Sequence, residues 1–393
     1  MFFVSKRWRW LVALVPLFPP LYFVSFAFLK HWRVLGPTAR RFVLFFLATQ
    51  LLAALFTPNP LLSLPLAAVR SLFIISLLIA GSVLREVGWF RYLLWGITAV
   101  LVIALYTSWI HAGGHFLLRR LSHPYYSTVS LALAAAIVLW YVIDWSEAPL
   151  WTRAGLAIIA VAALLYSGSR GALIGFTAGV VAAAAFAHQR RYLTGTAITA
   201  GIIATAYLLT RFFHILPLER LLNLTHLSGR DEVWRSALHA FSQHPIGGVG
   251  PYQLGPWLDK LYNHTCTLWH GLVLIGYKTC PDWLLQFYGF WLIAHNTILH
   301  SLGETGVIGT AGLVALLGLV GYAALRSQNA FLISLFFGYM VLGLVDNPIS
   351  VPSLHLAEAF WVAGGMALAQ AGLTIPLEQR VAVDDDQLGP DAL

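Results

Sequence analysis

The stretch LAIIAVAALLYSGSRGALIGFTAGVVAAAAFA, residues 156–187, decides the fold. Two apolar runs flank a short polar corner, and neither run alternates polar and apolar residues as a strand of a membrane barrel does. Such runs suit helices, which satisfy their own backbone groups inside a bilayer. The corner contains one charged residue, Arg170, which lies at a membrane boundary in this interpretation.

The same pattern extends over most of the 393 residues, of which 59% are hydrophobic and only 10% are charged. A helix needs about 20 apolar residues to cross the hydrocarbon core. With a proline-rich apolar stretch at 10–29, the runs predict an all-α polytopic membrane protein with about twelve transmembrane helices. The other expected spans are 42–56, 61–84, 92–110, 127–143, 154–168, 171–187, 193–210, 303–325, 329–345 and 354–373.

Residues 10–29 contain Pro16, Pro19 and Pro20, which break a regular helix. This stretch either crosses once or enters the membrane and returns as a hairpin, and the basic residues that follow favour the return. The positive clusters between the later spans then share one side, the cytoplasm of a bacterial inner-membrane protein. We interpret the net charge of +8 as a topology signal with contacts to bilayer lipids, and we expect no nucleic-acid partner.

The chain divides into four parts. We expect an N-terminal transmembrane bundle (1–210), a periplasmic loop (211–294), C-terminal transmembrane helices (295–373) and a disordered cytoplasmic tail (374–393). The loop is too long for a connector and should contain short helices. One is expected from a cap at Ser228 to His244-Pro245, because apolar residues recur at helical spacing between them.

The two cysteines of the chain, Cys266 and Cys280, both lie in this loop. In an oxidising periplasm a disulfide between them is expected, and two free thiols are the alternative.

Two arginines beside small residues are candidate binding sites for an anion. Arg170 in Ser167-Gly168-Ser169-Arg170 suits a lipid-borne phosphate, which a guanidinium binds bidentately, or else it reaches toward lipid headgroups. Arg230 lies at the start of the expected loop helix, where free N–H groups attract anions. Its alternative role is a surface ion pair with Asp231 or Glu232.

His295 and Asn296 lie where the loop meets the next span. A histidine there suits a general base near neutral pH, with Asn296 orienting it or binding sugar, although a structural role is also open. Arg70, inside the span 61–84, either helps to hold a phosphate or marks a helix boundary. Arg119 and Arg120 make the first outer loop basic, which also suits an anionic substrate.

The sequence shows no His-Glu-x-x-His motif, no Cys/His cluster with metal spacing and no nucleotide-binding loop. We therefore expect no metal and no cofactor, and a substrate that is already activated.

Three segments together resemble the O-antigen ligase family and its wider ligase/polymerase superfamily. They are Ser167–Ala172, Ser228–Gly250 with its His-Pro-Ile-Gly-Gly-Val-Gly ending, and His295–Gly309 with its Glu-Thr-Gly-Val-Ile-Gly ending. The resemblance covers roughly 150–325. It implies a bundle of about twelve helices that transfers a glycan from undecaprenyl pyrophosphate to an acceptor.

By the same resemblance, Arg170 and Arg230 would bind the pyrophosphate and stabilise it as the leaving group. His295 would lie near the acceptor hydroxyl as base or orienting group. The interval between Arg230 and His295 is long for the family. A ligase acting on lipid A–core is the first expectation. A polymerase of the same superfamily, a protein O-oligosaccharyltransferase and a transporter without chemistry are the alternatives.

Overall fold

The computed structural model describes residues 9–112, 119–222, 229–258, 279, 281–282, 292–351 and 356–375. All the regular elements in these ranges are helices, and an isolated β-bridge joins Leu35 to Thr374. The all-α prediction is therefore confirmed. The α-helices are α1 (Arg9–Leu14), α2 (Pro37–Leu55), α3 (Pro60–Leu84), α4 (Phe90–Ala112), α5 (Thr128–Asp144), α6 (Leu150–Ser167), α7 (Arg170–Phe186), α8 (Leu193–Phe212), α9 (Leu216–Leu222), α10 (Arg230–Gln243), α14 (Thr297–Arg326), α15 (Ala330–Leu342) and α16 (Ala357–Gln370). The 3-10 helices are η3 (Pro19–Val34), η4 (Val87–Trp89), η6 (Arg190–Tyr192) and η7 (Gly255–Trp257).

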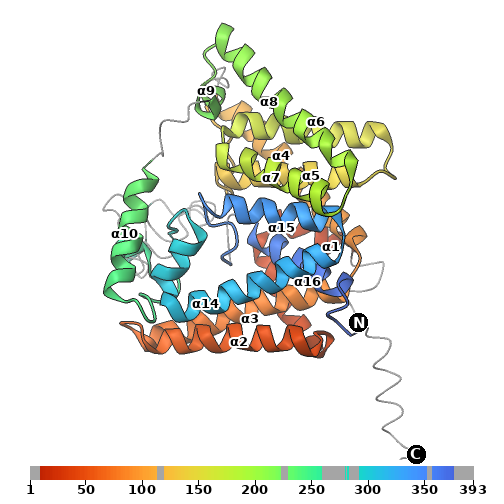
Figure 1. The fold of residues 1–393 in the computed structure, drawn as a ribbon. Coiled ribbons are helices and arrows are strands. Elements are labelled where there is room, and N and C mark those ends of the chain that lie inside the picture. Colours follow the sequence, from red (N-terminus) through yellow and green to blue (C-terminus); the bar gives the residue numbers. More distant parts are fainter. Residues whose placement is uncertain are drawn as a thin grey trace, which may run out of the picture.

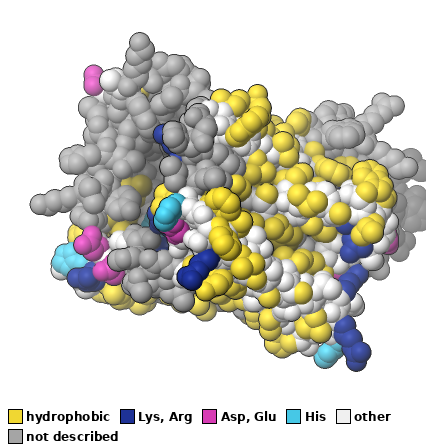
Figure 2. Space-filling model, turned by 90° about the horizontal axis from the view of Figure 1, so that it is seen from above, with side chains coloured by type: hydrophobic (Ala, Val, Ile, Leu, Met, Phe, Trp, Pro, Cys, Tyr) yellow, Lys and Arg dark blue, Asp and Glu magenta, His cyan; other side chains and the backbone are white. Residues whose placement is uncertain are grey.

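The described helices have the length and composition of membrane spans. Six are long and apolar enough to cross a bilayer: α2, α3, α4, α6, η6 with α8, and α14. Helices α5, α7 and α15 are apolar but shorter. Hydrophobic side chains cover the middle of the face seen in Figure 2, and Lys and Arg side chains lie toward both of its ends. These features make the chain a polytopic membrane protein.

The helices form two groups that α15 joins (Figure 1). In one group α2 packs on α14 and α3 packs on α16, and in the other α5 packs on α6 and α7. Helix α15 contacts α7 on one side and α14 and α16 on the other. Helix α10 lies across one end of the bundle and packs against α14. We call this end the α10 end.

Helix α5 forms the centre of its group, because residues 130–143 are all buried. A helix that is apolar on every side is stable only when other helices surround it. Trp140 of α5 is fully buried, and its indole N–H donates to the Phe176 carbonyl of α7 at 3.1 Å. The helices that carry the polar corner at 167–171 are thereby held in place.

The N-terminal segment packs on α4 and α3, and most of it is not α-helical. Helix α1 has only six residues, and η3 follows as a 3-10 helix of 16 residues. The Pro16 carbonyl accepts a hydrogen bond from the Tyr126 hydroxyl at 2.5 Å, and η3 then packs on α3 back to Val34. The prolines explain the difference, because they remove backbone donors and leave room for a tighter helix.

Two element boundaries differ from the sequence predictions. The residue that caps α10 is Gly229, in the left-handed conformation with φ +77°, and not Ser228, which lies outside the described residues. Helix α14 begins at Thr297 and not at 303, because the side chain of Asn296 accepts a hydrogen bond from Leu299 N at 2.9 Å and caps it. The 211–258 part of the expected loop also contains α9, which apolar spacing alone does not reveal.

Helix α14 is broken at Gly306, which has φ +58° and ψ −164°, a conformation that glycine alone readily adopts. A break leaves backbone groups without helical partners. The segment after α10, residues 245–250, supplies them, and we call 245–250 with 303–308 the joint. Its bonds, each 2.9 Å long, run from Val249 N to Gly303 O, from Gly250 N to Glu304 O and from Val307 N to Pro245 O.

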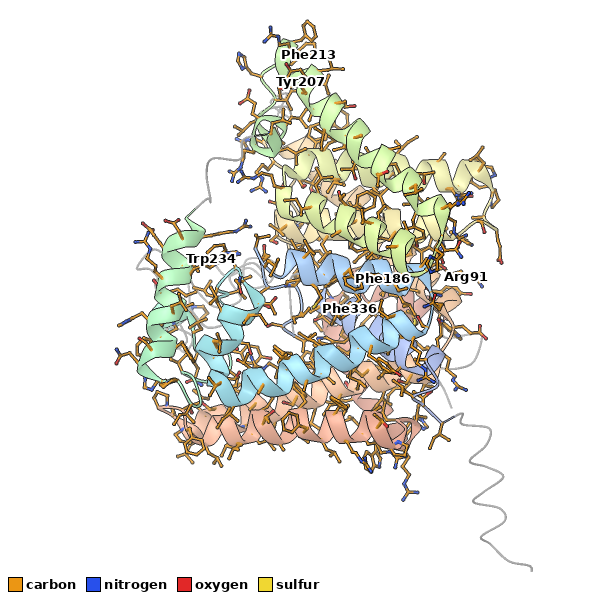
Figure 3. The ribbon with its side chains drawn as sticks, in the orientation of Figure 1. Arg91, Phe186, Tyr207, Phe213, Trp234 and Phe336 are labelled. Carbon is orange, nitrogen blue, oxygen red and sulfur yellow. The ribbon has the colours of Figure 1, made fainter. Side chains whose placement is uncertain are left out.

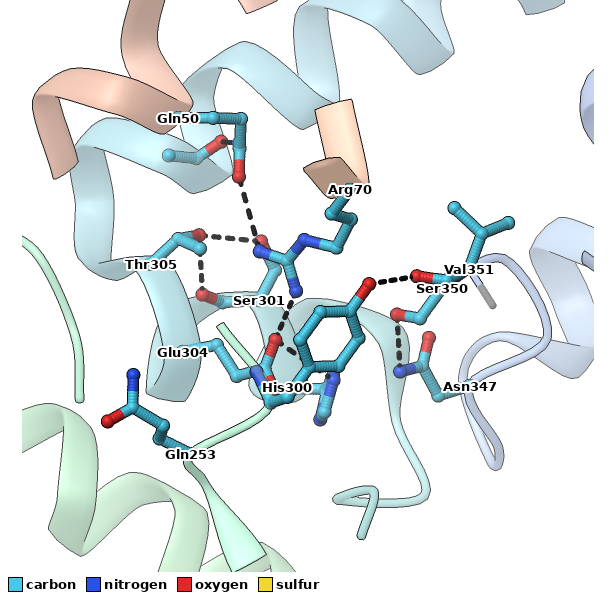
Figure 4. Close-up of polar contacts among 12 residues, drawn as sticks. Gln50, Arg70, Gln253, His300, Ser301, Glu304, Thr305, Asn347, Ser350 and Val351 are labelled. Carbon is cyan, nitrogen blue, oxygen red and sulfur yellow. Dashed lines mark hydrogen bonds and ion pairs between the residues drawn. The ribbon is translucent and has the colours of Figure 1, made fainter. Parts of the chain in front are cut away.

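The joint also contains a buried carboxylate, that of Glu304, which is 1% exposed (Figure 4). It forms an ion pair with Arg70 of α3 and accepts a hydrogen bond from Tyr252 N at 2.7 Å. Arg70 also donates to Gln50 of α2 at 3.3 Å. Breaking a buried ion pair by removing one partner costs about 3–5 kcal/mol, because the other charge is left buried.

We predict that Gly306→Ala destabilises the protein by about 1–3 kcal/mol or more, because alanine strains this backbone conformation and its Cβ would clash with the Ile246 carbonyl. Gly318→Ala in the same helix is the control, because a Cβ there meets nothing within 4 Å. Thermal unfolding in detergent measures both. Equal melting temperatures for the two variants would contradict the assigned role of Gly306.

Candidate functional site

A pocket of about 270 Å³ opens at the α10 end. Segments from five parts of the chain meet in it, and four of its lining residues are arginines. Sites that enclose a drug-sized ligand measure about 300–1,000 Å³. The volume of this pocket suits a small charged group better than a long polymer. Its lining residues are Arg120, Val129, Gly168, Ser169, Arg170, Gly171, Arg220, Gly229, Arg230, Val233 and His295.

The corner between α6 and α7 forms one wall of the pocket. Gly168 ends α6 in the left-handed conformation, with φ +59°. A Cβ at this position would lie 2.6 Å from the Pro217 carbonyl, so only glycine lets α9 pack here. This packing brings Arg220 of α9 to the same pocket as Arg170, the first residue of α7. The small residues of the corner thus position two arginines.

Two helix N-termini line the pocket, those of α7 and α10. Neither has a side-chain cap: Ser169 and Gly229 precede the helices without a capping hydrogen bond from their side chains. The first N–H groups of a helix have no intrahelical partner, and the helix dipole adds partial positive charge there. Both helix starts also carry an arginine, Arg170 or Arg230. The combination is suited to a doubly charged anion such as a pyrophosphate.

Arg120 completes the basic lining from the loop before α5. Its Nε donates to the Ser167 carbonyl at 2.8 Å, which holds the guanidinium beside the corner. Burial and, to a smaller extent, the nearby charges of Arg220 and Arg230 together lower the pKa of Arg120 to about 10. The group stays cationic at neutral pH. Burial and the neighbouring arginines disfavour the charged form of Arg120, and an anion in the pocket would offset this.

His295 lies at the edge of the pocket, just before α14. Its Nδ1 lies 3.2 Å from Oδ1 of Asp346, a fully buried carboxylate. A carboxylate accepts, so Nδ1 carries the proton and Nε2 of the neutral ring is left as an acceptor. Trp234 points from α10 toward this segment (Figure 3), and its indole N–H donates to the His295 carbonyl at 3.1 Å.

Asp346 links the histidine to the arginines. Its Oδ2 lies 3.7 Å from Arg230, and its Oδ1 also accepts from Asn347 N at 2.8 Å. One buried carboxylate therefore orients the imidazole and a guanidinium together. A carboxylate that is hydrogen-bonded to one ring nitrogen fixes the tautomer and the orientation of a functional histidine.

The structure brings together four of the predicted site residues: Arg120, Arg170, Arg230 and His295. Arg70 lies apart in the joint with Glu304. Asn296 uses its amide to cap α14 and to donate to the Leu344 carbonyl at 2.8 Å, and Arg119 is exposed outside the lining. Cys266 and Cys280 lie outside the described residues, so the disulfide stays a prediction.

Sequence reasoning missed two residues of the site, Arg220 and Asp346. Asp346 carried a usable signal: it is an acidic residue directly after an apolar run, on the same predicted side as His295. Arg220 lies on a seven-residue helix that leaves no periodic pattern. Among the described residues, no group of three His, Cys, Asp or Glu side chains could hold a metal ion.

Comparison with known families gives one match. The model of the O-antigen ligase family matches residues 154–314, a segment that contains Arg170, Arg220, Arg230 and His295. No curated protein matches the sequence. Arg120 and Asp346 lie outside the matched segment. Arg120 lines the pocket, and Asp346 contacts His295. Residues 154–314, less than half of the chain, are thus similar to the O-antigen ligase family.

Proposed function

We propose that the protein is an O-antigen ligase, which transfers a polysaccharide from undecaprenyl pyrophosphate to lipid A–core oligosaccharide. One observation carries the proposal: four arginines and two uncapped helix N-termini converge beside a histidine that a buried carboxylate orients. The first set suits the pyrophosphate of a lipid-linked donor, and the second suits the hydroxyl of an acceptor.

The proposed reaction exchanges one glycosidic bond for another. The acceptor oxygen bonds to the anomeric carbon of the donor sugar while the bond from that carbon to the pyrophosphate oxygen breaks. The electron pair leaves with the pyrophosphate, which gains negative charge. Donors already aimed at the developing charge stabilise such a transition state. Arg170 and Arg230 extend from the two helix N-termini at the pocket and would do this without a metal ion.

His295 would receive the proton of the acceptor hydroxyl at Nε2. Asp346 holds the Nδ1–H, so the ring presents its acceptor nitrogen and gains stability as it becomes cationic. Arg230 contacts the same carboxylate at 3.7 Å, which couples the anion site to the base. The 270 Å³ pocket encloses the reacting linkage, and the glycan and the polyprenyl chain extend beyond it.

The proposed orientation follows from the charges at the two ends. Clusters of arginine lie between the spans at the end opposite α10, where Arg91 is labelled in Figure 3. The positive-inside rule assigns such an end to the cytoplasm. The pocket would then face the periplasm of a multi-pass inner-membrane protein. Tyr207 and Phe213 are exposed at the C-terminal end of α8, where aromatic side chains suit the interface between the inner membrane and the periplasm.

We predict that Arg170→Ala and Arg230→Ala each lower transfer by about 10²- to 10³-fold, because each removes a cation from the leaving group. The corresponding lysine variants should also be impaired, since lysine cannot bind phosphate bidentately. Arg235→Ala is the matched control on α10, where Arg235 is exposed and pairs with Asp231. Transfer is measured with purified protein and lipid-linked donor. Undiminished transfer in both alanine variants would refute the site assignment.

Asp346→Asn should lower transfer by about 10²-fold or more, because an amide can present its N–H to the ring and stabilise the wrong tautomer. The substitution keeps the shape of the buried side chain. Donor binding should fall much less than turnover, since the four arginines remain. The check is steady-state kinetics with donor and acceptor varied separately. Turnover equal to that of the unmodified protein would remove Asp346 from the mechanism.

Deleting the gene tests the reaction itself. A ligase defect should leave long glycan on the lipid carrier and lipid A–core without it, because polymer is made but not transferred. Gel analysis of surface glycan and analysis of the carrier measure both pools. Single repeat units on carrier and core would identify a polymerase of the same superfamily instead.

A further inference from the structure

His295 has a strained backbone. Its φ is +49°, a region that residues other than glycine rarely adopt, and such strain costs about 1–3 kcal/mol. The conformation persists only when the surroundings impose it. Three hydrogen bonds at or next to the histidine hold it in this conformation. Trp234 Nε1 donates to the His295 carbonyl, Asn296 Nδ2 donates to the Leu344 carbonyl, and Thr297 N donates to the Gly343 carbonyl.

The residue before the histidine is held by another histidine. Ala294 is fully buried, so its N–H needs an acceptor, and His300 Nδ1 lies 3.4 Å away in that role. An accepting Nδ1 carries no proton, so the proton of the neutral ring is on Nε2. That nitrogen faces Oε2 of Glu304 at 3.4 Å. His300 itself is 5% exposed and lies outside the lining of the pocket.

Glu304 fixes the His300 ring from the joint. Arg70 pairs with the same oxygen, Oε2, and the Tyr252 N–H occupies the other, Oε1. The guanidinium of Arg70 also lies over the Tyr252 ring, 5.3 Å from its centroid. With both oxygens occupied from separate segments, the carboxylate cannot turn without breaking several contacts (Figure 4). It therefore gives the His300 ring a fixed partner.

We propose that Arg70, Glu304 and His300 form a buried relay that positions His295 through the Ala294 backbone. The relay runs from the ion pair to the His300 ring, and from Nδ1 of that ring to the N–H next to the strained residue. It rests on the proposed function, in which His295 receives the acceptor proton. The three residues are positioning residues, because none of them lines the pocket.

Two substitutions of His300 test its contact with Ala294 N–H and its contact with Glu304 separately. His300→Asn places an amide oxygen near the site of Nδ1, so it keeps an acceptor for Ala294 N–H and loses the contact with Glu304. His300→Gln places its amide nitrogen near the site of Nε2, so it keeps the contact with Glu304 and loses the acceptor. The acceptor acts directly on His295, so the glutamine variant should be the weaker enzyme.

We expect kcat to fall about 10-fold or more in His300→Gln, as for a buried N–H left without an acceptor. His300→Asn should recover only part of that loss, because it restores the acceptor without the contact that Glu304 gives the His300 ring. The KM for the lipid-linked donor should stay within about twofold in both, because the arginine pocket is intact. Binding of inorganic pyrophosphate, measured by calorimetry, should also be retained and reports the fold. His188→Asn and His188→Gln are the controls, because they make the same substitutions at an exposed histidine after α7.

Three results would overturn the relay. They are full kcat in His300→Gln, a larger loss in the asparagine variant than in the glutamine variant, and parallel loss of kcat and pyrophosphate binding in both. His295→Ala distinguishes this failure from failure of the proposed function. If His295→Ala is inactive and His300→Gln is fully active, only the relay is wrong. If His295→Ala transfers glycan normally, the proposed base is wrong and the relay has nothing to position.

Discussion

A single carboxylate, that of Glu304, imposes a constraint on which much of this structure depends. A charge at 1% exposure in an apolar bundle must be neutralised and fully hydrogen-bonded. Its partners come from α3, from the segment after α10 and from the first turns of α14. Satisfying this one group therefore fixes three parts of the chain relative to one another. The segment after α10 and the start of α14 then hold Arg230 and His295 at one place.

The pocket differs from the joint in the charges that line it. Four arginines meet there, and the buried carboxylate of Asp346 contacts Arg230 and His295. Burial, and then the nearby charges of Arg220 and Arg230, lower the pKa of Arg120. In a low-dielectric setting, several like charges at one place attract an anion more strongly than they would in water. The ion pair of the joint holds segments of the chain together, whereas the arginines of the pocket are suited to an anion.

The sequence was sufficient for the helical fold and for part of the site. Apolar runs depend on local composition, so α2 to α8 appear near their expected positions, and the corner at Arg170 was recognisable from its small neighbours. The partner of a polar residue is not a local property. The ion pair of Arg70 with Glu304, 234 positions away, could not be predicted from the sequence. The capping contact of Asn296 with α14 was likewise not predicted, and a role of either residue in substrate binding stays a prediction.

The roles of the glycines could not be predicted for the same reason. Gly306 and the segment 245–250 each look like an ordinary turn, and only together do they make a joint that exchanges backbone hydrogen bonds. Two segments about 60 residues apart are thus a single structural unit. A chimera that takes 245–250 from one relative and 303–308 from another would combine halves that were selected separately. Domain boundaries chosen for recombination or loop grafting should enclose both segments or neither, whatever the length of the sequence between them.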